Sequence, residues 1–264
     1  MAVNRWWDTD PAEVYWMEIT GRDDLGANLA APQTDERGEE YVGYTLVREV
    51  HDGDVVFHFD RNLGQIVGWS RAVGGPYTGT IVWAARGTSF RQHGGGEAYE
   101  RLGWFFNLEG LYPLDEPVTL AWLRGHEDEV RAVRATLAAT YPGTLYFPFA
   151  VSDRRPLRAA QTYMAKFPAG LVSRVPTLAA VGREATATHS IGAPPRPRAP
   201  QSADATPGTD YREADEDATT AGRDPFEVDP NLVDRALHDN RAAVDAGSRP
   251  HFHDVIGGAD RVLI

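Results

Sequence analysis

The sequence predicts an α+β protein whose main domain is a small, partly open β-barrel flanked by α-helices. Two observations lead to this prediction. Much of the chain before residue 150 consists of short stretches rich in β-branched and aromatic residues, bounded by Gly, Asp or Pro, as strands are. Longer stretches with apolar residues at helical spacing are few. Short strands of varied length with a few peripheral helices favour a barrel over a doubly wound parallel sheet.

The individual elements follow from local patterns. The expected strands are Tyr15–Ile19, Val55–Phe59, Gln65–Ser70, Thr80–Trp83 and Thr144–Phe149. The sequence DRNLG at Asp60–Gly64 separates the second strand from the third and is typical of a β-hairpin turn. Two helices are expected, at Glu127–Tyr141 and Leu157–Phe167, because apolar residues recur there every three or four positions.

The composition changes at Gly182. Residues 182–224 contain APPRPRAP and READEDATTAG and few side chains that could be buried. Such a stretch cannot offset the conformational entropy lost on ordering, about 1–2 kcal/mol per residue. We therefore expect a folded domain at 1–181, a disordered acidic linker rich in Pro and Ala at 182–224, and a short helical tail at 225–264. The tail includes PFEVDPNLVDRALHD, whose apolar residues share one helical face.

Charge and composition exclude several classes of protein. The chain has 264 residues, a formal net charge of −12 and no cysteine. Disulfides, thiolate metal sites and cysteine nucleophiles are thus excluded. The negative charge argues against a nucleic-acid binder held by phosphate neutralisation alone, although arginines cluster locally. The sequence shows neither a membrane-length apolar run nor a signal-peptide pattern, so we expect a cytoplasmic protein without a membrane partner.

Common catalytic and metal-binding motifs are absent from the sequence. It contains no GxSxG, HExxH, GxxxxGK[ST] or CxxC. We therefore expect no catalytic residue, no metal site, no cofactor and no catalytic activity in this chain itself. An alternative stays open, in which His238, His251, His253 and Asp254 hold a metal ion and the chain is a metal-dependent nuclease or hydrolase.

Aromatic residues are concentrated in the strand-rich part of the chain. Rings left around the mouth of a small barrel could stack on a planar heterocycle, an interaction worth about 1–3 kcal/mol per base. The alternative for each ring is ordinary burial in the core. The residues concerned are Trp16, Tyr41, Tyr44, Trp69, Tyr77, Trp83 and Trp104.

Five sequence segments occur in an order that matches a known domain family. They are EVYWMEITG, DGDVVFHFD, QIVGWSRAVG, LYPLDEPVTLAWLRG and LYFPFAVSDRRPLRAAQTYMAKFP. Together they resemble the EVE domain of the PUA-like superfamily, in the form found at the N-terminus of modification-dependent restriction endonucleases. The similarity runs over residues 15–181. Its strongest elements are the GD-hairpin-IVG unit at 53–68 and PVTLAWL at 117–123.

The resemblance implies a reader of modified bases. EVE domains and their relatives, the YTH readers of methylated adenine and the SRA readers of methylated cytosine, take one base out of the helical stack into a pocket. We expect the chain to bind DNA carrying methylated or hydroxymethylated cytosine by base flipping, as the specificity module of a modification-dependent restriction system. A partner nuclease, or a C-terminal nuclease domain missing from this chain, would cut the DNA. Recognition of modified RNA is an alternative.

The resemblance also places the pocket. Trp83 falls where the relatives have a cage tryptophan, and Tyr41 and Tyr44 stand where the opposite wall is expected. The relatives often have Trp or an Arg-Asn pair there, so it stays open which of the two tyrosines, if either, faces the base. Trp69 could equally be core. The expected base-binding residues are Trp83, Tyr41, Tyr44, Trp69, Ser70, Thr20, Gly21 and Arg22. The expected phosphate-binding residues are Arg86, Arg91 and Arg101, around the loop Gly94–Gly96, and Arg154, Arg155 and Arg158.

Overall fold

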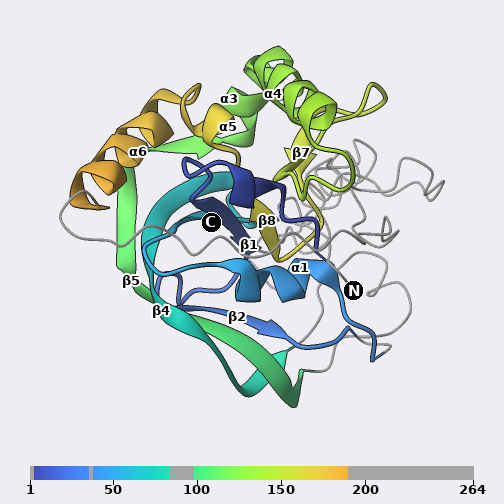
Figure 1. The fold of residues 1–264 in the computed structure, drawn as a ribbon, viewed down its shortest axis with the longest axis vertical. Coiled ribbons are helices and arrows are strands. Elements are labelled where there is room, and N and C mark those ends of the chain that lie inside the picture. Colours follow the sequence, from blue (N-terminus) through green and yellow to red (C-terminus); the bar gives the residue numbers. More distant parts are fainter. Residues whose placement is uncertain (1–2, 36–37, 84–97, 190–264) are drawn as a thin grey trace, which may run out of the picture. The chain divides into compact units, whose positions relative to one another are not determined.

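The computed structural model describes residues 3–35, 38–83 and 98–189. The chain divides into two compact units, Met1–Glu216 and Asp217–Ile264, and all described residues belong to the first. Figure 1 shows the ribbon. The elements are η1 (Trp6–Thr9), β1 (Tyr15–Thr20), β2 (Asn28–Pro32), α1 (Val42–Thr45), η2 (Leu46–Glu49), β3 (Val55–Asp60), β4 (Gln65–Trp83), β5 (Tyr99–Thr119), α3 (Leu120–Gly125), α4 (Glu127–Thr140), β6 (Phe149–Ala150), β7 (Arg158–Ala159), β8 (Met164–Lys166), α5 (Ala169–Val172) and α6 (Pro176–His189).

The strands form a curled mixed sheet in the order β2-β5-β4-β3-β1-β8, and β6 and β7 form a separate two-stranded sheet. Within the curled sheet β1 and β3 are parallel and the other pairs are antiparallel. The long strands β4 and β5 bend around the molecule (Figure 1), and their pairing register shifts at three points. Such irregularities bend a strand and increase its twist. The predicted α+β class, with a partly open barrel and flanking helices, is confirmed.

Tyr163 spans the opening of this barrel. It directly precedes the edge strand β8, and its hydroxyl accepts a hydrogen bond of 2.8 Å from the backbone N–H of Ala30 in the other edge strand, β2. Its backbone carbonyl accepts a 2.7 Å bond from the N–H of Ile19 in β1. Since β2 and β8 are not paired with each other in the described sheet, a side chain holds the two edges together.

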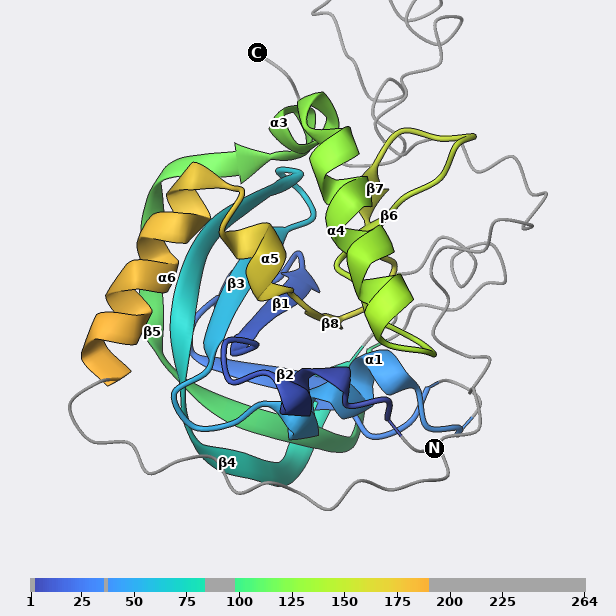
Figure 2. The ribbon, with the colours of Figure 1, turned by 45° about the horizontal axis from the view of Figure 1, so that its top comes forward.

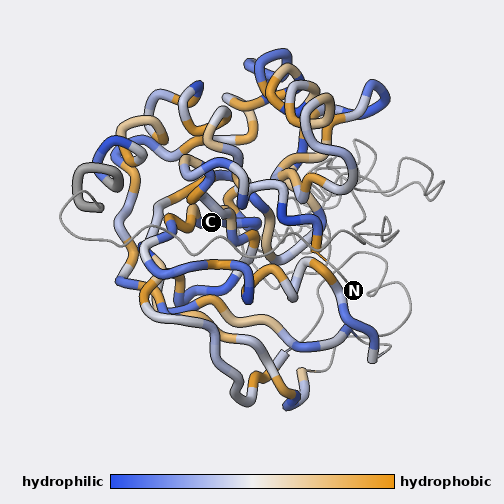
Figure 3. Tube along the Cα trace, viewed as in Figure 1, coloured by the Kyte–Doolittle hydropathy of each residue, from blue (hydrophilic) through white to orange (hydrophobic). Residues whose placement is uncertain are grey.

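The hydrophobic core lies inside the curl of the sheet and beneath the helices. Met17, Phe57 and Phe106, from β1, β3 and β5, are fully buried, as is Leu178 of α6. Helix α6 lies beside β5 (Figure 2). Hydrophobic and hydrophilic stretches alternate along α4 (Figure 3), because one of its faces packs on the core and the other meets water.

Two local predictions are confirmed. The helix expected at Glu127–Tyr141 is α4, which ends one residue earlier. The hairpin turn at Asp60–Gly64 joins β3 to β4. The Asp60 carboxylate accepts hydrogen bonds from the backbone N–H groups of Asn62 (2.7 Å) and Leu63 (3.2 Å). Gly64 has a φ of 64°, a conformation that favours glycine.

The helix expected at Leu157–Phe167 is wrong. The structure has the short strands β7 and β8 there, linked by a segment without regular structure. Apolar residues do recur at helical spacing in this stretch, but polar residues between them, including Thr162 and Lys166, are buried too. A segment enclosed on nearly all sides has no polar face, so the spacing of its apolar residues carries no helical information.

The strand predictions differ from the structure in extent. Gln65–Ser70 and Thr80–Trp83 belong to one continuous strand, β4, although the GGP at 74–76 suggests a break. Its partner β5 is not predicted, and of the expected strand Thr144–Phe149 only Phe149 lies in a strand, β6. Helix α6 runs across the expected domain end at Val181. The linker beyond residue 189 and the tail lie outside the described residues.

Within the stretches that the structure describes, no helix is both long and apolar enough to cross a membrane.

Candidate functional site

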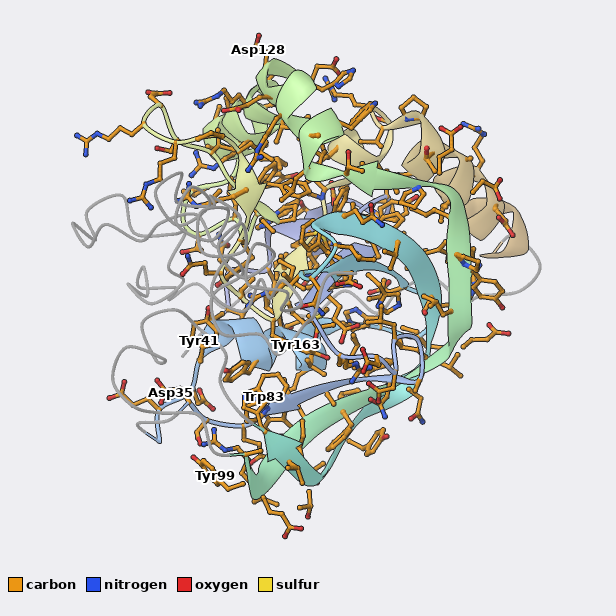
Figure 4. The ribbon with its side chains drawn as sticks, turned by 180° about the vertical axis from the view of Figure 1, so that it is seen from behind. Asp35, Tyr41, Trp83, Tyr99, Asp128 and Tyr163 are labelled. Atoms are coloured by element: carbon orange, nitrogen blue, oxygen red, sulfur yellow. The ribbon has the colours of Figure 1, made fainter. Side chains whose placement is uncertain are left out.

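Four aromatic side chains meet beside the opening of the barrel. Tyr41, Tyr44, Trp83 and Tyr163 are termed the aromatic cluster. The ring of Tyr44 in α1 lies 4.9 Å from that of Tyr41 and 5.5 Å from that of Trp83, measured between centroids. Trp83 in turn lies 5.6 Å from Tyr163. Figure 4 shows Trp83 between α1 and the end of the β4–β5 ribbon. Tyr41, Tyr44 and Trp83 are half-buried, whereas Tyr163 is buried.

The rings of the aromatic cluster meet edge to face. The interplanar angles are 78° for Tyr41 and Tyr44, 78° for Tyr44 and Trp83, and 87° for Trp83 and Tyr163. A base held between two walls needs two roughly parallel rings with a gap between them. In this arrangement a planar ligand therefore stacks on a single ring, or separates Tyr44 from Trp83.

Local sequence brings the tyrosines of α1 to the segment before β8. Tyr41 is the N-cap of α1, and its hydroxyl donates a 3.0 Å hydrogen bond to the carbonyl of Gln161. Gly43 lies in α1 where a Cβ would overlap the hydroxyl of Thr162 and lie 2.6 Å from the Tyr41 ring. The absence of a side chain at Gly43 thus lets the helix approach residues 161–163 closely.

A buried polar network lies behind the aromatic cluster and consists of Glu18, Arg22, His58, Ser70 and Tyr163. One carboxylate oxygen of Glu18 accepts a 2.7 Å hydrogen bond from the Tyr163 hydroxyl, and the other lies 2.7 Å from His58 Nδ1. His58 Nε2 lies 2.7 Å from the Ser70 hydroxyl, which donates to the carbonyl of Gly110. Arg22 Nε lies 3.4 Å from Glu18. The network therefore connects β1, β3, β4 and β5 to the ring beneath Trp83.

The charges in this network keep Glu18 ionised and Tyr163 protonated. Burial alone would raise the pKa of Glu18, but the hydrogen bond and charge of His58, aided by Arg22 and Tyr163, lower it below its ordinary value. Burial and the charge of Glu18 raise the pKa of Tyr163 well above 10. Tyr163 thus remains a hydrogen-bond donor to Glu18, which fixes its ring against Trp83.

Glu18, His58 and Ser70 have the connectivity of a catalytic triad but not its accessibility. All three residues are 0% exposed, and the Ser70 hydroxyl is engaged by Gly110. A nucleophile must reach its substrate, so these residues support the fold rather than form an active site. Ser70, one of the expected base-binding residues, belongs to this network.

The other expected base-binding residues lie in two places. Trp69 is buried and stacks on Tyr112, with 4.7 Å between centroids, so its ring is engaged outside the aromatic cluster. Thr20 and Gly21 lie at the end of β1 and are half-buried. Arg22 follows them and donates hydrogen bonds to the side chain (3.3 Å) and the backbone carbonyl of Asn28.

Among the residues that the structure describes, four buried side-chain nitrogens have no hydrogen-bond partner. Three of them belong to expected site residues: Trp83 Nε1, Arg22 Nε and Arg158 Nη1; the fourth is Trp7 Nε1. Arg22 Nε still lies within ion-pair distance of Glu18 and Asp24. A buried donor without an acceptor costs about 1–3 kcal/mol. An indole N–H can only donate, so an acceptor supplied by a ligand would satisfy Trp83.

Only some of the expected phosphate-binding arginines lie among the residues that the structure describes. Arg154 and Arg155 are exposed between β6 and β7, and Arg158 in β7 is half-buried. Burial and the charge of Arg155 lower the pKa of Arg158. The neighbouring acid, Asp153, is paired with Arg131 at 2.8 Å. Arg101 in β5 is half-buried and donates a hydrogen bond to the carbonyl of Thr34. Arg86, Arg91 and Gly94–Gly96 lie outside the described residues.

Sequence reasoning misses Tyr163, Glu18 and His58. Glu18 and His58 lie in strands that the sequence does predict, but each is a polar residue on a sheet buried on both faces, which alternation alone would place outward. Tyr163 lies in the segment expected to be helical. For metal ligands, the described part of the chain holds no group of three or more suitable side chains. His238, His251, His253 and Asp254 lie outside the described residues.

Comparisons with known proteins yield distant structural neighbours. No family model matches the sequence, and no curated protein matches it. The ASCH protein of Zymomonas mobilis is 10% identical over 46% of this chain and 82% of its own, with a TM-score of 0.26. The N-terminal domain of Staphylothermus marinus McrB is 15% identical over 43% of this chain and 80% of its own, also with a TM-score of 0.26. A Pseudomonas putida protein is 11% identical over 62% and 98%, with a TM-score of 0.34. Similarity this low carries no argument about function.

Proposed function

We propose that the first unit binds DNA and takes a modified base, methylated or hydroxymethylated cytosine, out of the helix onto the aromatic cluster. The chain then acts as the specificity module of a modification-dependent restriction system whose nuclease is a partner or a further domain. The observation that carries this proposal is Trp83: a half-buried ring that meets the half-buried Tyr44 edge to face, with an indole N–H for which no described residue supplies an acceptor. The resemblance of five sequence segments to EVE domains supports the same function.

The energetics of the site are compatible with base flipping. Extruding a base costs a few kcal/mol. Stacking on Trp83 returns about 1–3 kcal/mol, and a hydrogen bond to its indole N–H removes the cost of an unsatisfied donor. These terms are similar in size, so a base that is already weakly stacked or paired is favoured.

Selectivity for the modification needs more than one methyl group. Burying a methyl contributes about 1 kcal/mol, which is roughly a fivefold difference in affinity. Thr20 and Gly21 offer backbone and hydroxyl groups near the network, and Arg22 is held there by Glu18 and Asn28. We assign the reading of the polar edge of the base to these three residues.

We assign contacts with the phosphates of the DNA backbone to the arginines of the β6–β7 hairpin. A guanidinium group matches phosphate geometry and remains charged at all relevant pH values. Arg154, Arg155 and Arg158 follow one another closely, and Asp153 is occupied by Arg131. A local excess of positive charge on this hairpin allows DNA binding by a chain whose net charge is −12.

A binding panel tests the proposal. Fluorescence anisotropy is measured with duplexes that differ at one base: cytosine, 5-methylcytosine, 5-hydroxymethylcytosine, adenine and N6-methyladenine. Wild-type protein is expected to prefer one modified duplex, and Trp83→Ala to lose that preference with an unchanged circular dichroism spectrum. Trp122→Ala is the matched control, since Trp122 in α3 is also half-buried but stacks on His126, which lies between α3 and α4.

Other outcomes overturn the proposal. If Trp83→Ala unfolds the protein, Tyr44→Ala repeats the test at a smaller, half-buried ring. Equal affinity of the wild-type protein for all duplexes contradicts base recognition. Tighter binding of the same modified base in RNA reassigns the ligand. Degradation of modified DNA with manganese or magnesium, abolished by His251→Ala, makes the chain an enzyme instead.

A further inference from the structure

Tyr99 faces the same side of the β-ribbon as Trp83. The two residues are directly opposite each other at the end of the antiparallel β4–β5 ladder. Opposed residues in such a ladder project from the same face of the sheet with Cβ atoms about 5 Å apart. Figure 4 shows both side chains at this end of the molecule. Whereas Trp83 is half-buried, Tyr99 is 48% exposed.

The guanidinium group of Arg101 lies over one face of the Tyr99 ring. Arg101 lies two residues further along β5 and therefore on the same face. Its guanidinium carbon is 4.2 Å from the centroid of the Tyr99 ring. Its Nη1 donates a 3.0 Å hydrogen bond to the backbone carbonyl of Thr34, just after β2. A guanidinium anchored at one end and stacked on a ring at the other restricts the motion of that ring.

Two further exposed tyrosines of the ribbon stack on aromatic rings. Tyr77 is 42% exposed and stacks on Phe105 at 5.4 Å, and Tyr112 is 42% exposed and stacks on Trp69 at 4.7 Å. Each of these two rings lies nearly parallel to its neighbour, which covers one of its faces. Tyr99 is thus distinguished by an anchored cation on its ring and by its position beside the aromatic cluster.

We propose that Tyr99, backed by Arg101, is a second stacking platform, which holds the nucleobase adjacent to the one bound at Trp83. This inference rests on the proposed function. When one base leaves the helix, its neighbour loses a stacking partner and exposes a π-face, which an exposed aromatic ring can cover. Because every base has a π-face, the platform adds affinity for a nucleic-acid strand without adding sequence preference. The ligand of the whole site is therefore a short stretch of unstacked strand, not a single nucleotide.

The test compares two ligands of different length on the full chain. One is the modified nucleoside 5′-monophosphate, and the other is a single-stranded trinucleotide with the same modified base in the middle. Wild-type protein is expected to bind the trinucleotide at least tenfold more tightly. Tyr99→Ala should remove most of that gain and leave mononucleotide binding unchanged. Tyr99→Phe should keep the gain, because stacking needs only the ring. Tyr112→Ala, at a similarly exposed tyrosine, should change neither affinity.

Several results would overturn the inference. If Tyr99→Ala leaves the affinity for the trinucleotide unchanged, Tyr99 is not a stacking platform. The same conclusion follows if the wild-type protein binds the trinucleotide no more tightly than the mononucleotide. An equal loss for both ligands places Tyr99 in the first base site instead. Failure of the proposed function looks different: Trp83→Ala then leaves mononucleotide binding unchanged. Arg101→Gln gives an independent check, since loss of the backing cation should weaken only trinucleotide binding.

Discussion

Replacement of Tyr163 by phenylalanine tests how the site is held together. The change removes one hydroxyl group and leaves the ring that contacts Trp83. That hydroxyl donates a 2.7 Å hydrogen bond to the Glu18 carboxylate and accepts a 2.8 Å bond from the backbone N–H of Ala30. Tyr163 is 4% exposed, so water has no ready access to the groups left behind.

The magnitude follows from these two bonds. A hydrogen bond to a charged group contributes about 1.5–3 kcal/mol, and a buried donor left without a partner costs about 1–3 kcal/mol. We expect the free energy of unfolding to fall by about 3 kcal/mol. The Tyr163 hydroxyl also helps to lower the pKa of Glu18, so the variant should lose stability at a higher pH than the wild-type protein as the solution is acidified.

Urea denaturation monitored by circular dichroism measures this change. Tyr41→Phe is the control, because the Tyr41 hydroxyl makes an exposed hydrogen bond to Gln161, and its loss should cost less than about 1 kcal/mol. If Tyr163→Phe and Tyr41→Phe destabilise the protein equally, the hydroxyl does not hold the two edges of the barrel together, and our account of the opening fails.

Three further predictions concern charge and stacking. The pKa of Glu18 in the folded protein is lowered from 4.5, so the stability that Glu18 provides is present above that pH and is lost as the pH falls through the folded-state pKa. Glu18→Gln should therefore flatten the dependence of unfolding free energy on acid pH in a series of urea titrations. An unchanged pH dependence would contradict the lowered pKa of Glu18. Arg154→Ala combined with Arg155→Ala should weaken binding to all DNA sequences alike and reduce the slope of log affinity against log salt by about 1–2, whereas an unaltered slope removes this hairpin from the interface. Tyr44→Ala should weaken the preference for the modified duplex less than Trp83→Ala, since tyrosine has the smaller ring; a larger effect would make Tyr44 the principal stacking surface.

The features that the sequence predicts correctly are those encoded locally. The turn at Asp60–Gly64 needs only a capping carboxylate and a glycine with positive φ, and both act within five residues. Helix α4 is recognisable because one face meets water and the other does not. The strand order of the barrel, in contrast, depends on pairing between residues far apart in the chain, as in β1 with β8.

The site is less predictable than the fold. Trp83, Tyr41 and Tyr44 could be selected from sequence, and the structure brings these three rings together. Tyr163 could not, because its segment is enclosed and has no periodic pattern to assign its face. Tyr99 was missed for a different reason. Its role depends on lying opposite Trp83, and that register is fixed only when the whole of β5 pairs with β4.

The extrusion of a base is tested most directly by a fluorescent neighbour. In a duplex with 2-aminopurine beside the modified cytosine, loss of stacking on that cytosine increases the 2-aminopurine emission. We expect the emission to rise when wild-type protein saturates the duplex, with saturation shown separately by anisotropy, and not to rise with Trp83→Ala at equal occupancy. Unchanged emission with fully bound wild-type protein would mean that the base stays in the helix.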